Sequence, residues 1–107
     1  MKRYIRSSEL TDFEVIVNFG GYIGADEPYT VTAKSIEEAE EKAVTFAKED
    51  LTVEDICQND EDEWVVTIGF CGMIGVENDY EVYADSEEEA ELTALQEAEW
   101  DLTPEVQ

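Results

Sequence analysis

The feature that most constrains the fold of this sequence is an internal repeat with an offset of 51 residues. Without any gap, this offset aligns residues 13–56 with residues 64–107, and 19 of the 44 aligned pairs are identical. Two copies are too few for a solenoid, so the repeat favours one pseudo-symmetric domain over residues 1–107. The predicted parts are an N-terminal arm (1–12), a first unit (13–56), an acidic linker (57–63) and a second unit (64–107).

The hydrophobic periodicity changes once within each unit. The segments "FEVIVNF" and "YTVTA" in the first unit, and "WVVTIGF" and "YEVYA" in the second, are rich in β-branched and aromatic residues and are predicted strands. A Glu-rich segment with regularly spaced alanines follows each second strand and predicts a helix, over about residues 36–50 and 87–102. Ser35 and Ser86 precede these helices as N-caps, and Glu38 and Glu89 stand three residues later, as in a capping box.

This order of elements predicts an α+β fold built as a tandem ββα-ββα repeat. We expect a four-stranded, mainly antiparallel sheet with both helices on one face, because the small alanines let each helix lie close to the sheet. The side chains predicted to face the sheet are Ile36, Ala39, Ala43, Phe46, Ala47 and Leu51 from the first helix and Ala90, Ala94, Ala98 and Leu102 from the second.

Glycine-rich stretches, "NFGGYIG" and "GFCGMIG", follow the first strand of each unit. A phosphate-binding loop opens directly into a helix and usually supplies a lysine, whereas here a second strand follows and no lysine is near. Gly21, Gly24, Gly72 and Gly75 are therefore predicted to allow bulges, positive φ angles or close backbone approach beside a hairpin. The turns themselves are predicted at "ADEP" and "VEND".

The composition is strongly acidic, with 29 Asp and Glu against six Lys and Arg and a formal net charge of −23. Every basic residue lies at or before Lys48. Such a charge repels nucleic acid and anionic membranes, so the expected partner is a basic protein surface. No apolar stretch approaches the roughly 20 residues of a membrane span, and no hydrophobic region follows the basic N-terminal residues, which predicts a cytoplasmic protein.

The residue types that most catalytic sites use are scarce. The chain contains no histidine, and its two cysteines, Cys57 and Cys71, are predicted to be buried, inert thiols. The run "DEDE" at residues 60–63 lacks the glycine and the final glutamate of an EF-hand loop. We therefore expect no catalytic residues, no metal site and no cofactor, and the protein is predicted not to be an enzyme.

Positions at which the two units differ indicate a candidate binding surface. In the second unit Tyr83, Leu92 and Trp100 replace a threonine and two glutamates of the first, and helical geometry places Leu92 and Trp100 away from the core. Apolar side chains in an acidic shell are typical of interface anchors, since aromatic residues are enriched at binding hot spots. Alternatively, the N-terminal arm, which contains Tyr4, Ile5 and Leu10, folds over them.

The rows of acidic residues suggest that the protein imitates nucleic acid. Duplex DNA carries a charge about every 1.7 Å of its axis, and a helix rises about 1.5 Å per residue, so an exposed acidic helix can approach that density. The predicted partner-binding residues are Glu37, Glu38, Glu40, Glu41, Asp60, Glu61, Asp62, Glu63, Tyr83, Glu88, Glu89, Glu91, Leu92, Glu99 and Trp100.

The small size, the acidic body and the segments "YTVTAKSIEEAEEKA" and "YEVYADSEEEAE" resemble small proteins carried by bacteriophages and other mobile elements. Some proteins of this type act as anti-CRISPR or anti-restriction DNA mimics. The resemblance implies an inhibitor that occupies a basic DNA- or RNA-binding surface of a host defence nuclease, with a Cas nuclease as the leading target, in the cytoplasm of a bacterial host.

The alternative is a non-enzymatic interaction module or homodimeric adaptor that binds through Trp100, Leu92 and Tyr83. Salt distinguishes the two, because binding by charge mimicry weakens steeply with ionic strength whereas an apolar interface changes little.

Overall fold

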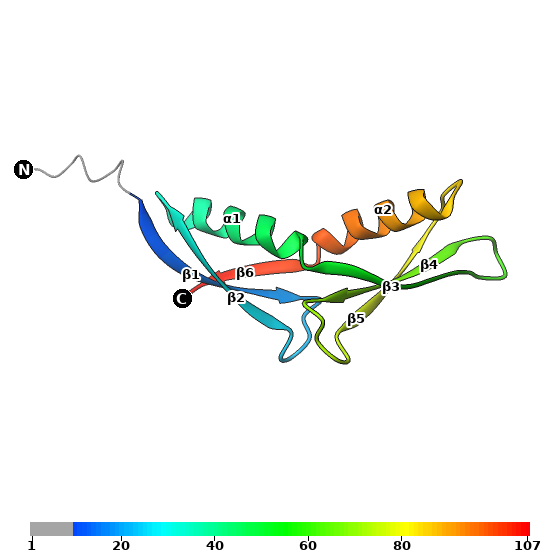
Figure 1. Ribbon diagram of the computed structural model, residues 1–107, viewed down its shortest axis with the longest axis horizontal. Coiled ribbons are helices and arrows are strands. Elements are labelled where there is room, and N and C mark those ends of the chain that lie inside the picture. Colours follow the sequence, from blue (N-terminus) through cyan, green and yellow to red (C-terminus); the bar gives the residue numbers. More distant parts are fainter. Residues whose placement is uncertain (1–9) are drawn as a thin grey trace, which may run out of the picture.

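The computed structural model describes residues 10–107, which form six strands and two helices in an elongated body of 67 × 28 × 16 Å (Figure 1). In chain order the elements are β1 (Thr11–Phe19), β2 (Asp26–Ala33), α1 (Ile36–Lys48), β3 (Leu51–Gln58), β4 (Trp64–Phe70), β5 (Glu77–Val82), α2 (Glu87–Glu99) and β6 (Leu102–Val106). The predicted α+β class with two helices is confirmed.

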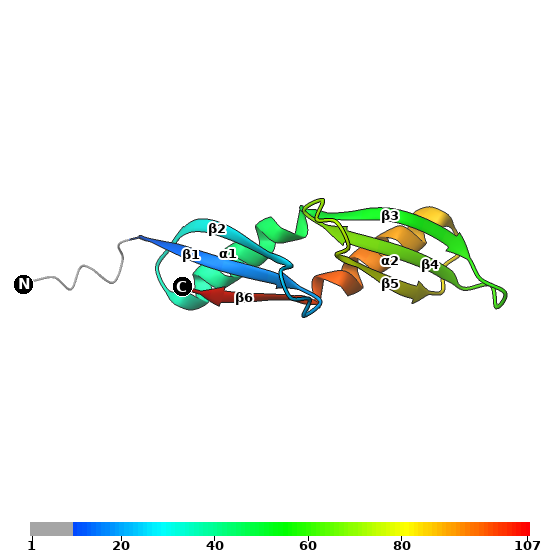
Figure 2. The ribbon, with the colours of Figure 1, turned by 90° about the horizontal axis from the view of Figure 1, so that it is seen from below.

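The strands form two separate antiparallel sheets of three strands each, in the orders β2-β1-β6 and β3-β4-β5 (Figure 2). The prediction of one four-stranded sheet is therefore wrong, and a further strand follows each helix, where the ββα unit was expected to end. These strands, β3 and β6, begin at Leu51 and Leu102, which the sequence prediction placed in the helices. A β-branched threonine follows each leucine and favours extended backbone over another helical turn.

The third strand of each sheet comes from the other unit of the repeat. After α1 the chain crosses to the second sheet, where β3 pairs with β4, and after α2 it returns, so that β6 pairs with β1. The two crossings are equivalent, because Leu51 lies opposite Phe70 and Leu102 lies opposite Phe19. We call β1, β2, α1 and β6 the first half, and β3, β4, β5 and α2 the second half.

Each helix packs on the sheet of its own half, and the two helices lie end to end on the same side of the body (Figure 1). Their C-terminal ends meet at the centre, where Lys48 of α1 forms an ion pair with Glu99 of α2 at 3.6 Å. A cation is favourable there because the C-terminal end of a helix carries partial negative charge. Both helices therefore share one side of the molecule, although they cover two sheets.

Both helices begin where the sequence predicts. The Ser35 hydroxyl accepts a hydrogen bond from the N–H of Glu38 at 3.1 Å, and the Ser86 hydroxyl accepts one from the N–H of Glu89 at 3.2 Å. The Glu38 carboxylate reaches one residue further back than in the usual capping box, since it accepts from the N–H of Lys34 at 2.6 Å. Each cap thus satisfies N–H groups at a helix start.

Alanines form the buried face of both helices, and two phenylalanines join the halves. The fully buried helical residues are Ala39, Ala43, Ala47, Ala90, Ala94 and Ala98. Phe19 of β1 and Phe70 of β4 are also fully buried, with ring centroids 5.7 Å apart. Ile36 and Phe46, both predicted core residues, are instead 55% and 49% exposed, because the narrow alanine stripe faces the sheet and leaves them at its edge.

The glycine stretches form the turns of the β1–β2 and β4–β5 hairpins. Positive φ angles are found at Gly20, Gly21, Gly24, Gly72 and Gly75. The predicted positive φ angles are confirmed, but the turns predicted at "ADEP" and "VEND" are wrong, because Asp26 already belongs to β2 and Glu77 to β5. Pro28 fits within β2 because β2 is an edge strand, where a missing N–H is tolerated.

The connection between β3 and β4 is shorter than the predicted acidic linker. Cys57 and Gln58 belong to β3, and Cys57 is exposed, which corrects the prediction that this thiol is buried. The side-chain oxygen of Asn59 accepts hydrogen bonds from the N–H groups of Glu61 at 2.8 Å and Glu63 at 3.0 Å. Asn59 therefore fixes the turn that carries the "DEDE" acids.

Candidate protein-interaction surface

Acidic side chains cover the surface of both halves. Residues 10–107 contain 28 of the 29 Asp and Glu residues of the chain but only three lysines, and within this range no charged residue is buried. Like charges at this density repel one another and attract a partner of opposite charge. A basic protein therefore meets exposed carboxylates along the body.

The predicted acidic residues fall into three groups rather than one site. Residues 37–41 lie near the start of α1, residues 88–91 near the start of α2, and residues 60–63 in the β3–β4 turn. Because the helices meet at their C-terminal ends, the two helical groups lie toward opposite ends of the body (Figure 1). Glu99 lies at the centre, beside Lys48. The structure thus distributes the acids along the molecule.

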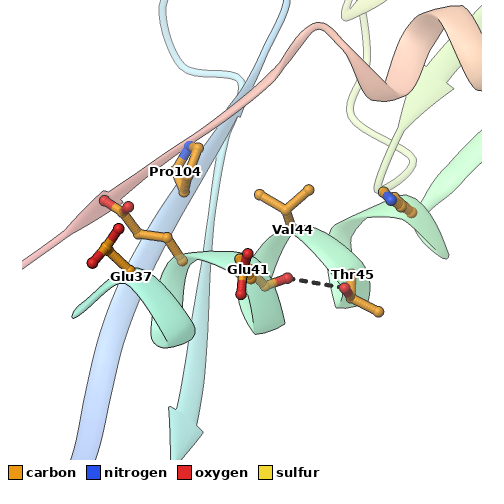
Figure 3. Close-up of a pocket in the computed structure, with 7 residues that line it drawn as sticks. Glu37, Glu41, Val44, Thr45 and Pro104 are labelled. Carbon is orange, nitrogen blue, oxygen red and sulfur yellow. Dashed lines mark hydrogen bonds between the residues drawn. The ribbon is translucent and has the colours of Figure 1, made fainter. Parts of the chain in front are cut away.

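A shallow groove lies between α1 and β6. The residues that line it are Glu37, Glu40, Glu41, Val44, Thr45, Lys48 and Pro104 (Figure 3). The Thr45 hydroxyl donates a hydrogen bond to the backbone carbonyl of Glu41 at 2.9 Å and so stays against its own helix. The groove combines the apolar Val44 and Pro104 with three carboxylates and one cation, Lys48, which pairs with Glu99. This combination suits a lysine or arginine of a partner, since such a side chain has an apolar stem and a cationic end.

Tyr83, Leu92 and Trp100 are exposed, at 76%, 59% and 86%, as the comparison of the two units predicts. They do not form one patch, because they lie before α2, within it and at its C-cap. The carboxylate of Glu63 lies near Tyr83 and raises the pKa of its hydroxyl. Trp100 stands at the meeting point of the two helices, in a groove that Val44 also lines.

The alternative cover for these residues, the N-terminal arm, is described only in part. Residues 11 and 12 belong to β1, and Leu10 is 56% exposed. Tyr4 and Ile5 lie outside the described residues.

Two further exposed side chains were missed by sequence reasoning. Ile23 and Ile74, in the glycine-containing turns, are 103% and 100% exposed. They are identical residues at equivalent positions of the repeat, so a search for positions at which the units differ does not find them. Their location between flexible glycines rather than within a strand was the signal that could have revealed them.

The two hairpins that carry these isoleucines contact each other. The Tyr22 hydroxyl, in the first hairpin, donates to the Glu77 carbonyl at 2.8 Å and lies 2.9 Å from the side-chain oxygen of Asn78, in the second. A Cβ at Gly20 would lie 2.6 Å from the Asn78 amide nitrogen, so the backbone approach depends on this glycine. The hairpins are therefore fixed relative to each other at the boundary between the halves.

Two equivalent tyrosines hold the crossings between the halves. Tyr29 donates a hydrogen bond to the Asp50 carboxylate at 2.6 Å, and Tyr80 donates one to the Asp101 carboxylate. Burial raises the pKa of both hydroxyls, and these hydrogen bonds raise it further. Burial also raises the pKa of the neighbouring Cys71 thiol to about 11, so at neutral pH the thiol is protonated and is a poor nucleophile. This cluster is suited to structure rather than to chemistry.

Within residues 10–107, no group of three or more Cys, Asp or Glu side chains is arranged to hold a metal ion. Neither helix in this part of the chain is both long and apolar enough to cross a membrane. Comparisons with protein-family models, curated protein sequences and solved structures gave no match. Inference about function therefore rests on the charge, shape and exposed side chains of this surface.

Proposed function

We propose that this protein is a non-enzymatic inhibitor that imitates the charge of nucleic acid and occupies the basic nucleic-acid-binding surface of a host defence nuclease. The observation that carries this proposal is an elongated body, 67 Å long, that bears 28 carboxylates, none of them fully buried, and three lysines. In this role the protein has no catalytic residues of its own and acts in the cytoplasm of a bacterial host.

The density of carboxylates approaches the density of phosphates on a duplex. The 28 carboxylates along 67 Å correspond to about one per 2.4 Å, compared with about one charge per 1.7 Å of duplex DNA. The length of the body equals about 20 base-pair steps of 3.4 Å. A channel that neutralises phosphates with lysine and arginine would therefore find carboxylates along its length.

A Cas nuclease is the target that this shape favours. A nuclease of this type holds a heteroduplex of about 20 base pairs in a positively charged channel and recognises its geometry and backbone rather than its sequence. An acidic body of similar length can compete for such a channel without presenting bases.

Each unit of the repeat supplies the third strand of the other half, an arrangement that we call strand exchange. Strand exchange supports this role because it fixes the spacing of the acids. The shared core and the exchanged strands hold the α1 and α2 glutamates in one continuous structure. A preordered surface loses less entropy on binding than a flexible acidic chain of equal charge. The two groups of glutamates can therefore engage basic side chains simultaneously.

A cleavage assay with a purified, guide-loaded Cas9-type nuclease and its matched DNA duplex tests the proposal. We expect the protein to block cleavage when it is added before the DNA. Its apparent Kd should rise by about 100-fold or more between 50 and 200 mM salt, because charge contacts are screened. No inhibition, or inhibition that salt does not weaken, would contradict charge mimicry of this target.

Charge-neutral variants test whether the helical acids carry the binding. Glu37→Gln, Glu41→Gln and Glu88→Gln together remove exposed charges from both helices without altering the capping glutamates. We expect the triple variant to inhibit about tenfold less well at low salt and to show a shallower salt dependence. Gln96→Glu, which adds a carboxylate to the exposed side of α2, is the matched control and should not weaken inhibition.

The homodimeric or adaptor function remains the second candidate. The 86% exposure of Trp100 favours it, since tryptophan is enriched at the hot spots of protein interfaces. Sedimentation of the wild-type protein and of Trp100→Glu distinguishes the two, because a dimer that the substitution disrupts would support self-association.

A further inference from the structure

The ends of the two glycine-containing hairpins carry the most exposed large apolar side chains of the described residues, Ile23 and Ile74. Both hairpins project from the side of the body opposite the helices, near its middle (Figure 1). The acids of α1 and α2 and the two isoleucines therefore lie on different sides of the molecule.

Hydrogen bonds hold the first of these turns in one conformation. The Asn18 amide nitrogen donates to the Tyr22 carbonyl and to the Asp26 carboxylate, both at 2.8 Å, and the Asn18 side-chain oxygen accepts from the N–H of Gly21 at 2.8 Å. Tyr22 then connects this turn to the second hairpin. The turn that carries Ile23 is thus held in one conformation against the hairpin that carries Ile74, which lowers the entropic cost of binding.

The fold gives no reason for isoleucine at these two positions. A fully exposed side chain contributes nothing to the core, and a β-branched residue is not a preferred turn former. Neighbouring turn positions differ between the units, since Tyr22 corresponds to Met73 and Ala25 to Val76, yet isoleucine occurs in both. An isoleucine at both exposed positions is consistent with a role in binding rather than in folding.

Carboxylates surround the isoleucine pair. Asp26, Glu54 and Glu77 are exposed at the bases of the two hairpins, and the described lysines lie at the far end of β2 and on α1. A second copy of this chain would bring a net charge of −23 against the same negative surface, which opposes self-association through this face. The matching occupant is an apolar cleft bordered by lysine and arginine.

We infer that Ile23 and Ile74 are paired anchors that insert into an apolar cleft at the edge of the basic channel of the nuclease. This inference rests on the proposed function and adds a contact that salt does not screen. The helical acids set the salt dependence of binding, and the isoleucines supply affinity that persists when charges are screened.

The test measures the Kd of the wild-type protein and of the double variant Ile23→Ser, Ile74→Ser for the guide-loaded Cas9-type nuclease at 50 and 300 mM salt. Burial of two isoleucines corresponds to about 100-fold in affinity, so we expect the double variant to bind about 100-fold more weakly at both salt concentrations, with the same salt slope. Ile36→Ser, which replaces an exposed isoleucine on α1, is the matched control and should bind like the wild type. Unchanged melting temperatures confirm that all three proteins are folded.

Four results would overturn the inference. A double variant that binds like the wild type would show that the isoleucines are not anchors, and it would leave the proposed charge mimicry unaffected. A wild-type protein that does not bind the nuclease at all instead refutes the proposed function and the anchors with it. Wild-type dimers that the double variant abolishes, or binding of the wild type to neutral phosphatidylcholine vesicles, would assign the isoleucines to self-association or to a membrane.

Discussion

The two halves of this molecule share a fold but differ on their surfaces. The buried alanines, the serine caps and the phenylalanines at the centre occupy equivalent places in both halves. The described lysines, in contrast, all lie after β2 or on α1 in the first half, whereas the exposed Leu92 and Trp100 lie on α2. Core packing and strand exchange therefore constrain both units, while the outward faces of the helices are free to differ.

One local difference shows how the halves became unequal at their boundary. Gly20 and Cys71 are equivalent, and both have left-handed backbone, with φ of 68° and 53°. Their N–H groups donate to the carbonyls of Asp101 and Asp50, both at 2.9 Å, where the chain crosses between halves. Only Gly20 lies against the Asn78 amide, so only the first half requires a glycine there.

The largest effect is expected in a test of whether β6 or β3 is the third strand of the first half. Ile16 of β1 lies opposite Glu105 of β6. Without exchange it would lie opposite Asp55 of β3, because Asp55 lies opposite Thr67, the residue of β4 that is equivalent to Ile16. With both native cysteines replaced by serine, Ile16→Cys with Glu105→Cys should form an intramolecular disulfide in most molecules, because directly paired Cα atoms lie within disulfide range. Non-reducing electrophoresis and mass spectrometry of linked peptides measure this.

The matched control is Ile16→Cys with Asp55→Cys, which should remain reduced. A disulfide in the control at equal yield would show that each unit keeps its own third strand. Gel filtration separates intramolecular linkage from exchange between two chains.

The next effect concerns whether the halves unfold together. Phe19→Ala and Phe70→Ala each remove a fully buried ring, and each should lower the free energy of unfolding by about 3–5 kcal/mol. Because the core is continuous, we expect either variant to unfold in one transition that shifts circular dichroism and tryptophan fluorescence equally. Thr30→Ala, an exposed control, should change stability by less than about 0.5 kcal/mol. If Phe19→Ala leaves the signal of Trp64 unshifted, the halves are independent.

The smallest effect on stability is expected for substitutions at the boundary between the two halves. Gly20→Cys introduces the residue that the second half has at the equivalent position, Cys71. It should lower the free energy of unfolding by about 1–2 kcal/mol, because Gly20 has left-handed backbone and a Cβ there would crowd the Asn78 amide. Cys71→Gly relieves left-handed strain but loses a half-buried thiol, so its effect should stay within about 1 kcal/mol. Urea unfolding of both variants measures the difference, and equal costs would contradict the role of Asn78.

Local signals in the sequence predicted the local structure correctly. The serine caps, the alanine stripes and the strands β1, β2, β4 and β5 all follow from side-chain spacing within a few residues. The outward positions of Leu92 and Trp100 follow from the same helical geometry. Ile36 and Phe46 were misplaced because apolarity alone does not show how wide the buried face of a helix is.

Strand exchange could not be predicted from the sequence, because the repeat makes both pairings chemically alike. Leu51 opposite Phe70 and Leu51 opposite Phe19 are the same pair of residue types. Only the path of the chain after each helix decides between them. The isoleucine anchors were missed for a related reason, since identity between units does not distinguish a residue kept for packing from a residue kept for binding.

The exchanged strand also has a consequence for synthesis on the ribosome. The central strand of the first half ends at Phe19, but its partner β6 begins only at Leu102. At 5–20 residues per second, β1 therefore waits about 4–17 s with one edge unpaired. An unpaired edge invites aggregation, and like charges keep nascent chains apart. The acids that we propose to engage a basic channel thus also protect the protein's own unfinished sheet.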